Sequence, residues 1–237
     1  MAAVCARLGF WQLDRLSQRR AFNEQVRAGL EADPASLRDT LAAAADPGDV
    51  AYRRVRATGA YDPTHEVVLY GRALDGRPGD HILTPLVLDD GTAIVVDRGW
   101  VPFEANRELP VPGGAAAPAG PVTVEGFLEP PDDASPPGDD AVTTIRRIDL
   151  ELLQGQLPYE LAPLALQLES QSPAQAALPV PAPGPELSEG PHLSYAIQWF
   201  AFATIALGGS ALILRRERHD DRRVAEAGPA SSTERGS

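Results

Sequence analysis

The strongest constraint on this chain is a stretch without any ionised side chain, which runs from Leu193 to Leu214 and ends at an arginine cluster that begins with Arg215. About 20 apolar residues, each rising 1.5 Å along a helix, cross a hydrocarbon core about 30 Å thick. The sequence therefore predicts a transmembrane helix over residues 192–214. By the positive-inside rule, the arginines predict that residues 215–237 form a cytoplasmic tail, which we expect to be disordered. The longer body before the helix then lies outside the cytoplasm.

The amino-terminal segment predicts part of a second membrane helix. Residues 1–10 are mildly apolar but include Arg7, and they are too short for a spanning helix or for the apolar region of a signal peptide. We interpret them as the end of a first membrane helix whose upstream part is absent from the sequence. The alternative is that the carboxyl-terminal helix inserts alone. Apolar residues recur near helical spacing between residues 8 and 30, so residues 1–30 are assigned to this truncated helix and a juxtamembrane helix.

Residues 31–172 are predicted to form a β-rich extracytoplasmic domain, so the expected fold class is α+β with membrane helices at the ends of the domain. The sequence Asp89-Asp90-Gly91 predicts a hairpin turn. The glycines between Gly71 and Gly79 lack the flanking strand and helix of a phosphate-binding loop, and they predict a turn. Short helices are expected at residues 35–45 and 148–156. Strand composition is found at residues 50–61, 66–70, 82–88, 92–96, 122–128 and 164–169.

A proline-rich segment at residues 173–191 connects this domain to the predicted transmembrane helix. Such a composition favours an extended and mobile linker. The chain has 237 residues, which is enough for one domain of ordinary size together with an anchor and a tail.

Composition disfavours several classes of function. The net charge of −12 argues against nucleic acid as a partner, because phosphate contacts need a basic surface. Cys5 is the single cysteine, so an internal disulfide is impossible, and a cysteine-rich zinc site, a thiolate copper site or covalent haem attachment is disfavoured. The sequence contains no nucleophile elbow and no phosphate-binding glycine loop. An enzymatic function therefore has no positive support in the sequence.

The outer end of the predicted transmembrane helix carries a candidate site. On a helix that turns 100° per residue, His192, Tyr195, Trp199 and Phe202 form one stripe. A histidine at membrane depth is costly unless it has a partner, which makes His192 a functional candidate. Its imidazole is suited to haem iron, with the aromatic side chains against the porphyrin. The alternative, weighed equally from the residues alone, is a solvated histidine in the headgroup layer above an aromatic interfacial belt.

Two further blocks contain candidate residues. The first, Leu8–Leu16, has aromatic and polar side chains where a membrane helix would emerge, and its simpler interpretation is interfacial anchoring by Trp11 and Arg15. The second consists of residues 79–86 and 95–102, at predicted strand ends. For this second block, packing against the core is the favoured interpretation.

Taken in this order, the three blocks resemble the Surfeit locus protein 1 family, the membrane assembly factors of cytochrome c oxidase. The family motif Gly-x-Trp-Gln-x-x-Arg-Leu matches Gly9, Trp11, Gln12, Arg15 and Leu16. The motifs Gly-x-His-x-x-Thr-Pro and Arg-Gly-Trp-Val-Pro match Gly79, His81, Thr84, Pro85 and Arg98 to Pro102. The closing motif His-Leu-x-Tyr-Ala-x-Gln-Trp matches His192, Leu193, Tyr195, Ala196, Gln198 and Trp199. The resemblance covers residues 8–216, although the chain lacks most of the first membrane helix and has a longer proline-rich insert before the last helix.

The resemblance implies a non-enzymatic role in maturing the catalytic subunit of a haem–copper oxidase in a bacterial plasma membrane, with haem a held transiently and passed on. It implies that His192 ligates the haem iron and that Trp199 lies close by. Tyr195 is expected to complete the porphyrin-contacting face. Gln12, Arg15 and Arg98 are candidates for the propionates, since guanidinium groups suit carboxylates. Membrane lipid, the catalytic subunit and haem a synthase are the expected partners.

Two rival functions remain open from the sequence. A scaffold that holds oxidase subunits together without touching haem would depend on the domain surface around residues 98–102 and would tolerate the loss of His192. A membrane-anchored hydrolase is less well supported, because it needs a clustered acid, base and nucleophile that the sequence does not indicate.

Overall fold

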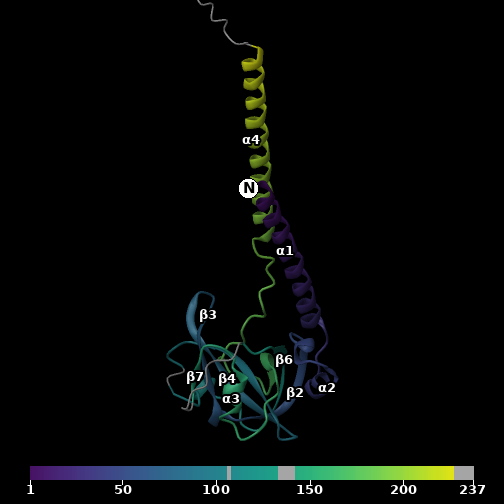
Figure 1. The fold of residues 1–237 in the computed structure, drawn as a ribbon. Coiled ribbons are helices and arrows are strands. Elements are labelled where there is room, and N and C mark those ends of the chain that lie inside the picture. The colour runs from purple at the N-terminus through teal and green to yellow at the C-terminus, as the bar shows by residue number, and fades with distance from the viewer. Residues whose placement is uncertain (106–107, 133–141, 227–237) are drawn as a thin grey trace, which may run out of the picture. The chain divides into compact units, whose positions relative to one another are not determined.

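The computed structural model describes residues 1–105, 108–132 and 142–226, and it divides the chain into two compact units (Figure 1). The first, the helical unit, consists of Met1–Asn23 and Leu187–Ser237. The second, the barrel unit, consists of Glu24–Glu186. Helices and strands are both present, so the expected α+β class is confirmed.

The barrel unit contains a sheet of eight strands in the described residues. The strand order is β1-β2-β6-β8-β5-β4-β3-β7, and β2 also pairs with β4. Strands β2, β6, β8, β5 and β4 therefore form a closed ring, which leaves no free edge among them. The strands are β1 (Ala35–Ser36), β2 (Arg54–Tyr61), β3 (Val67–Leu74), β4 (Arg77–Leu88), β5 (Ala93–Val101), β6 (Pro121–Glu129), β7 (Thr144–Ile145) and β8 (Ala165–Ser172).

Alternation along the strands separates two apolar layers. Ile94 and Val96 of β5 face the barrel interior, where they join buried residues of β2, β4, β6 and β8. Val95, between them, faces outward and packs in a second cluster with Leu150 and Leu153 of the short helix α3 (Leu150–Gln154). Because successive side chains of a strand point to opposite faces, one strand serves both layers. The helix α2 (Leu37–Ala43) adds Leu37 to the interior cluster.

The predicted elements of the barrel unit are found at or near their expected positions. The six predicted strands correspond to β2, β3, β4, β5, β6 and β8, and the two predicted short helices correspond to α2 and α3. The two-residue strands β1 and β7 were not predicted. Three 3-10 helices, also not predicted, are η1 (Pro47–Val50), η2 (Pro63–His65) and η3 (Gly113–Ala115).

The two hairpins before and after β4 give one confirmation and one correction. Strands β4 and β5 are antiparallel and joined at Gly91, whose φ is 84°, as the turn residues predicted. The predicted turn between Gly71 and Gly79 is wrong for most of that range. There the chain continues as β3 and β4, and the turn is confined to Asp75 and Gly76, with φ of 50° and 75°. Two successive residues with positive φ are typical of a type I′ hairpin turn, which matches the twist of the strands.

A fully buried ion pair lies in the interior of the barrel unit. Nη1 of Arg98 is 2.8 Å from Oε1 of Glu66, and neither side chain is exposed to solvent. Glu66 also accepts hydrogen bonds from the hydroxyl of Thr84 (2.9 Å) and the backbone N–H of Val111 (2.7 Å). Burial lowers the pKa of Arg98, while the carboxylate of Glu66 opposes this effect. The pair therefore connects β5 and β4 with the loop that carries Val111.

The remaining donors of Arg98 are also used inside the unit. Nη2 donates to the carbonyl of Ala115 at 2.9 Å, and Nε donates to the side chain of Gln175 at 3.3 Å. The guanidinium carbon lies 5.4 Å from the ring centroid of Tyr61, within the range of a cation–π contact. A charged group with this many partners can be kept in an interior at an acceptable free-energy cost.

The helical unit consists mainly of α1 and α4. Helix α1 (Ala2–Glu31) is continuous, which confirms a helix over residues 8–30 and extends it toward the amino end. Helix α4 (His192–Glu226) continues 12 residues beyond Leu214. Its section His192–His219 is the one helix in the described part of the chain that is long and apolar enough to cross a membrane. This suggests membrane anchoring, and no second spanning helix is found in α1.

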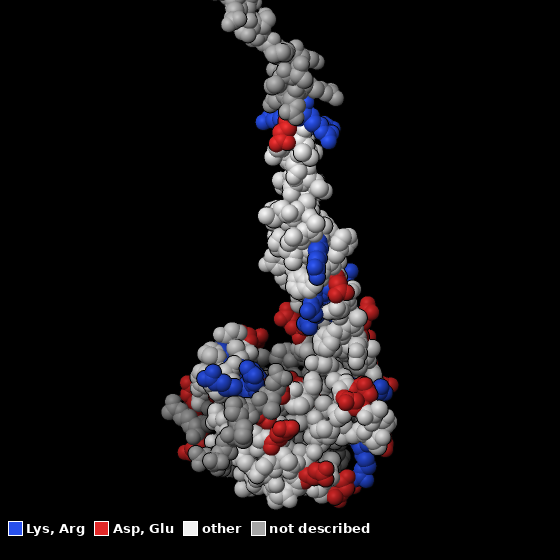
Figure 2. All heavy atoms as spheres, viewed as in Figure 1, with Lys and Arg blue, Asp and Glu red and all other residues white. Residues whose placement is uncertain are grey.

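The prediction of a disordered tail over residues 215–237 is wrong for its first part. Residues 215–226 belong to α4, and residues 227–237 lie outside the described residues. Arginine and glutamate are good helix formers, so the charged sequence extends the helix after the apolar stretch ends. Figure 2 shows an uncharged surface along the helix that gives way to a group of basic and acidic side chains. In the sequence, Arg215, Arg216 and Glu217 directly follow the apolar stretch.

The proline-rich segment between β8 and α4 has hydrogen bonds to the sheet. Trp100 of β5 and Val180 exchange two backbone hydrogen bonds of 2.7 and 2.8 Å. The side chain of Gln167 donates to the carbonyls of Ala182 and Pro183 at 3.0 and 2.9 Å. Prolines cannot donate a backbone hydrogen bond, so the segment binds the sheet through the N–H and carbonyl of Val180 and the carbonyls of Ala182 and Pro183. The composition predicted a mobile linker, whereas residues 180–183 are held against β5 and β8.

We predict that Glu66→Gln lowers the free energy of unfolding by about 3–5 kcal/mol, because it leaves the Arg98 charge buried without a counter-charge. The matched control is Glu125→Gln, which breaks the partly exposed ion pair with Arg56 and should cost less than about 1 kcal/mol. Both values can be measured by urea unfolding of the full chain in detergent, followed by tryptophan fluorescence. Equal losses for the two variants would contradict the special role of the buried pair.

Candidate functional site

The site in the helical unit depends on close packing between α1 and α4. Gly9 of α1 is buried, and a Cβ atom built on it would lie 2.7 Å from the ring of Phe200. Phe200 also makes an edge-to-face contact with Phe10, with ring centroids 5.2 Å apart. Only a glycine at this position lets the aromatic ring approach the α1 backbone so closely without a shift. The close approach allows side chains on the two helices to meet one turn further along.

His192 and Gln12 meet at this next turn. Nδ1 of His192 is 2.9 Å from Oε1 of Gln12, and both side chains are half-buried. An amide oxygen only accepts, so Nδ1 carries the hydrogen and donates it. In the neutral imidazole the other nitrogen, Nε2, then has a free lone pair. The hydrogen bond from His192 to Gln12 thus fixes both the tautomer and the orientation of the ring.

Gly190 lies next to the Nε2 side of the ring. A Cβ atom on Gly190 would come within 3.6 Å of Nε2 and 3.5 Å of the neighbouring ring carbon of His192. The backbone φ of Gly190 is 66°, a value that other residues rarely adopt. Both its conformation and the space that it leaves keep the Nε2 edge uncovered by a side chain at this position.

The segment before α4 is attached to α1 by polar contacts. Arg20 forms two hydrogen bonds with the carboxylate of Glu189, at 2.9 and 2.8 Å. Arg19 donates to the carbonyl of Ser188 at 3.0 Å, and Asn23 donates to the carbonyls of Leu187 and Ser188. The hydrogen bond from Arg20 lowers the pKa of Glu189. These contacts hold the start of α4, and hence His192, against α1.

The aromatic stripe lies beside the contact with α1. Ala196, Phe200 and Ala203 form the row of α4 residues that packs toward α1, and both alanines are buried. Tyr195 and Phe202 have exposed fractions of 46% and 52%, because they lie on the adjacent face. Helical periodicity puts His192 at the border of the two rows.

The third residue of the stripe, Trp199, contacts Phe202 edge-to-face at 5.9 Å between ring centroids. The predicted stripe is therefore an accessible aromatic surface that begins at the edge of His192.

The other predicted haem contacts differ in position. Arg15 is exposed on α1, with its guanidinium 5.6 Å from the ring centroid of Trp11 and a hydrogen bond to Gln18. It lies one turn from Gln12 on the same helix. Arg98, by contrast, belongs to the barrel unit and is fully buried with Glu66. The structure therefore brings His192 and Gln12 together, keeps Arg15 accessible nearby, and commits Arg98 to the interior of the barrel unit.

The second sequence block forms a polar cluster in the barrel unit. Nδ1 of His81 lies 2.7 Å from Oδ2 of Asp97, and Asp97 also accepts from the backbone N–H of Gly99 at 2.9 Å. Burial, together with the nearby charges of Asp97 and Asp132, raises the pKa of Glu129 to about 7. With Trp100 buried as well, these contacts are those expected from the packing interpretation of this block.

Known proteins are similar to this chain over most of its length. The model of the SURF1 family matches residues 1–204, which include α1 and the first part of α4. The chain belongs to the SURF1 family. An uncharacterized SURF1-like protein of Mycobacterium bovis is 31% identical over 227 residues, covering 92% of this chain and 81% of that protein. A SURF1-like protein of Rickettsia bellii is 27% identical, covering 83% of this chain and 80% of that protein. One from Dictyostelium discoideum is 30% identical over 44% of this chain and 41% of that protein.

SURF1 proteins form a cytochrome oxidase assembly family and are not a known class of enzymes. In this member, the described residues contain no group of three or more histidine, cysteine, aspartate or glutamate side chains that could hold a metal ion. A metal centre built from protein ligands alone is thus not indicated there. A single imidazole with a free Nε2 fits an iron whose other ligands come from a porphyrin.

Several residues of the site were not found from the sequence. Gly190 and Phe200 carry no recognisable signal alone, because their importance comes from the helix that lies opposite. Arg20 and Glu189 are separated by 169 positions, and the sequence contains many arginines and glutamates that could pair. Gly9 belongs to the first family motif, but the sequence contains no signal for its close contact with the ring of Phe200.

Glu129→Gln is predicted to remove a pH dependence of stability. With a pKa of about 7 in the folded state against an ordinary value of 4.5, Glu129 holds a proton more firmly in the folded protein. Stability should therefore fall as pH rises from 4.5 through 7, by on the order of 2–3 kcal/mol. The variant should lose this slope and be the more stable protein at pH 8. The free energies of unfolding of both proteins can be measured by urea unfolding at several pH values from 5 to 8. Parallel profiles of the two proteins would contradict the prediction, and Glu125→Gln on the same strand serves as the control.

Proposed function

We propose that the protein holds haem a as a transient cargo during cytochrome oxidase assembly and passes it to the catalytic subunit. The observation that carries this proposal is the hydrogen bond between His192 and Gln12, which leaves Nε2 with a free lone pair. A histidine that binds a metal almost always donates its other N–H to a second group, which fixes the ring and raises its basicity. In this proposal His192 is the axial ligand and Gln12 orients it.

The surface beside His192 suits a porphyrin. Tyr195 and Phe202 expose about half of their area, and Trp199 lies between them along the helix. Aromatic side chains on one face provide a large apolar surface against which a flat macrocycle can pack. Gly190 supports the same interpretation, since a larger residue would intrude on the Nε2 edge of the ring.

Arg15 is our candidate partner for a haem propionate. It is exposed, and its guanidinium group forms no ion pair within the described part of the chain. A guanidinium group can bind a carboxylate through two hydrogen bonds. Gln12 is assigned to His192 instead of a propionate, and Arg98 is assigned to the stability of the barrel unit.

The proposed orientation places the arginines after Leu214 on the cytoplasmic side and the barrel unit on the opposite side of a bacterial plasma membrane. In this arrangement His192 lies at the outer end of the apolar stretch, where the site can receive haem a from the membrane. The proposed partners are membrane lipid, haem a synthase as the donor, and the catalytic subunit as the acceptor. The position of the site at the end of an apolar helix supports this route, because haem a is itself largely apolar.

The decisive experiment is purification of the full chain from cells that make haem a. His192→Ala should reduce the bound haem at least about tenfold, and Gln12→Ala should weaken binding by about 10-fold through the lost orientation of the ring. The matched control is His219→Ala, on the same helix but beyond the arginine cluster, which should retain the haem. Visible absorption spectra of the purified proteins report both the amount of haem and its axial ligand.

An unchanged spectrum in His192→Ala would refute the ligand assignment. Oxidase assembly in cells then distinguishes the haem carrier from the rival function, a scaffold that does not touch haem. A scaffold that does not touch haem would support normal assembly in His192→Ala, whereas the haem carrier predicts an oxidase that is depleted of haem a. The His219→Ala strain should assemble the oxidase normally under either function.

A further inference from the structure

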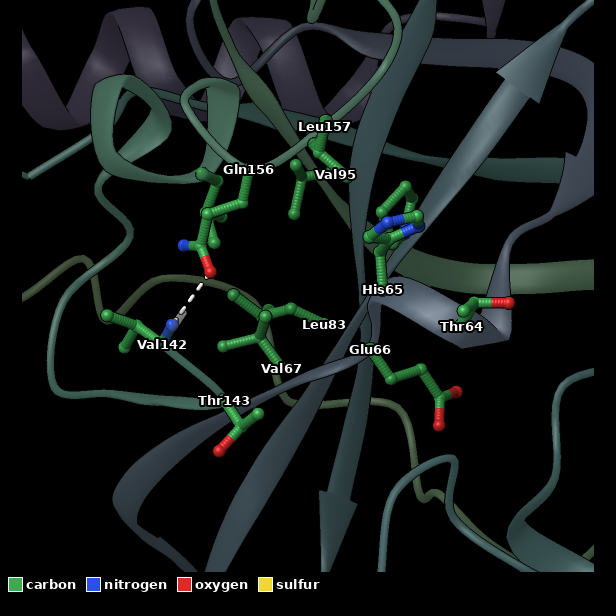
Figure 3. Close-up of a pocket in the computed structure, with 12 residues that line it drawn as sticks. Thr64, His65, Glu66, Val67, Leu83, Val95, Val142, Thr143, Gln156 and Leu157 are labelled. Atoms are coloured by element: carbon green, nitrogen blue, oxygen red, sulfur yellow. Dashed lines mark hydrogen bonds between the residues drawn. The ribbon is translucent and has the colours of Figure 1, made fainter. Parts of the chain in front are cut away.

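A cavity of about 260 Å³ lies in the barrel unit, outside the site described above (Figure 3). Its walls come from β3, β4 and β5 on one side and from α3 and the segments around it on the other. Seven of the twelve described lining residues are apolar, and besides Val142 they are Val67, Leu83, Pro85, Val95, Leu153 and Leu157. An apolar void forfeits the packing contacts that its lining atoms would otherwise make, and an apolar occupant would restore them.

We propose that this cavity binds a small, uncharged, mainly apolar molecule with one hydroxyl group, which forms a hydrogen bond with Nε2 of His65. This inference is independent of the haem proposal, because it concerns residues of the barrel unit only. Three features of the cavity support it: the lining residues, the contact of His65 with Asp62, and the volume.

The polar groups of the lining leave His65 as the group free to recognise a ligand. The side-chain oxygen of Gln156 accepts from the backbone N–H of Val142 at 2.7 Å. The carboxylate of Glu66 is occupied by Arg98 in the interior. Figure 3 shows that this carboxylate and the hydroxyls of Thr64 and Thr143 point away from the middle of the cavity.

One ring nitrogen of His65 is held by a carboxylate. Its Nδ1 lies 2.6 Å from Oδ2 of Asp62, and the hydroxyl of Tyr159 donates to the same oxygen at 2.9 Å. Burial alone would raise the pKa of Asp62, but the hydrogen bonds from His65 and Tyr159 outweigh it and lower the pKa. Asp62 is therefore ionised at neutral pH and accepts the hydrogen of Nδ1. Nε2 is then the ring nitrogen that is left for a ligand.

This arrangement selects the chemistry of the ligand. A hydroxyl group can donate or accept at Nε2, so it leaves the pair with Asp62 intact. A carboxylate ligand would lose its hydration in a mainly apolar cavity and would add a negative charge near that of Asp62, and both effects are unfavourable. An uncharged hydroxyl compound is therefore preferred to an acid of the same shape.

The volume limits the size of the ligand. A cavity of about 150 Å³ accommodates benzene, so about 260 Å³ accommodates roughly ten non-hydrogen atoms. 4-Propylphenol has this size and one hydroxyl. 4-Propyltoluene is its isostere with a methyl group in place of the hydroxyl, and 4-propylbenzoate is the charged analogue.

The test is a titration of the full chain in detergent, with leucine and valine methyl groups labelled for NMR. 4-Propylphenol should cause saturable shifts at Leu83, Val95 and Leu157, while the barrel-interior methyls of Leu86 and Val96 stay unchanged. 4-Propyltoluene should bind roughly threefold to tenfold more weakly, the contribution of one neutral hydrogen bond. 4-Propylbenzoate should cause no saturable shift.

Two variants complete the test. Leu157→Trp fills the cavity from a half-buried position and should abolish the shifts at Leu83 and Val95. His65→Phe should remove the preference for the phenol over the toluene while the cavity still binds both. The absence of saturable shifts in the unaltered protein would overturn the proposal, as would equal affinities for the two isosteres. These two outcomes need no variant, so a folding defect cannot obscure them.

Discussion

The structure of the barrel unit depends on the buried ion pair between Arg98 and Glu66. Two charges without solvent exposure are costly, and the cost is offset only when each donor and acceptor has a partner. Satisfying this condition requires Thr84 of β4, the backbone of Val111 and the carbonyl of Ala115 to be in place together. The pair therefore specifies how two strands and a long loop come together, a requirement that apolar contacts alone would impose less strictly.

In the helical unit, the main constraint is that His192 is held in one orientation at the start of an apolar helix. Packing of Gly9 against Phe200 brings the two helices together, and Gln12 then fixes the hydrogen of His192 on Nδ1. The aromatic surface lies beside the helix contact, so helix packing does not cover it. Close packing and an exposed aromatic surface coexist because they use adjacent rows of the same helix.

Local patterns in the sequence were sufficient for much of the fold. Strand composition located β2 to β6 and β8, and helical periodicity identified the aromatic stripe that begins at His192. Long-range contacts were not predictable in this way. The pairing of β2 with β4 closes the ring but leaves no local signal in the sequence. Arg98 is predicted to bind a propionate because its actual partner, Glu66, lies 32 positions away in the sequence. The helical residues after Leu214 were missed because charge was interpreted as disorder although it also favours an exposed helix.

The contacts that hold the start of α4 also have a consequence for the order of folding. Gln12 and His192 are 180 positions apart, and Arg20 and Glu189 are 169 positions apart. At a synthesis rate of about 5–20 residues per second, α1 emerges from the ribosome roughly ten to thirty seconds before its partners exist. The polar side chains of α1 therefore wait in a solvated state while the barrel unit folds. A nascent chain that stops before Leu187 contains the complete barrel unit and Gln12 but lacks His192, so the site is assembled only after the whole barrel unit has been synthesised.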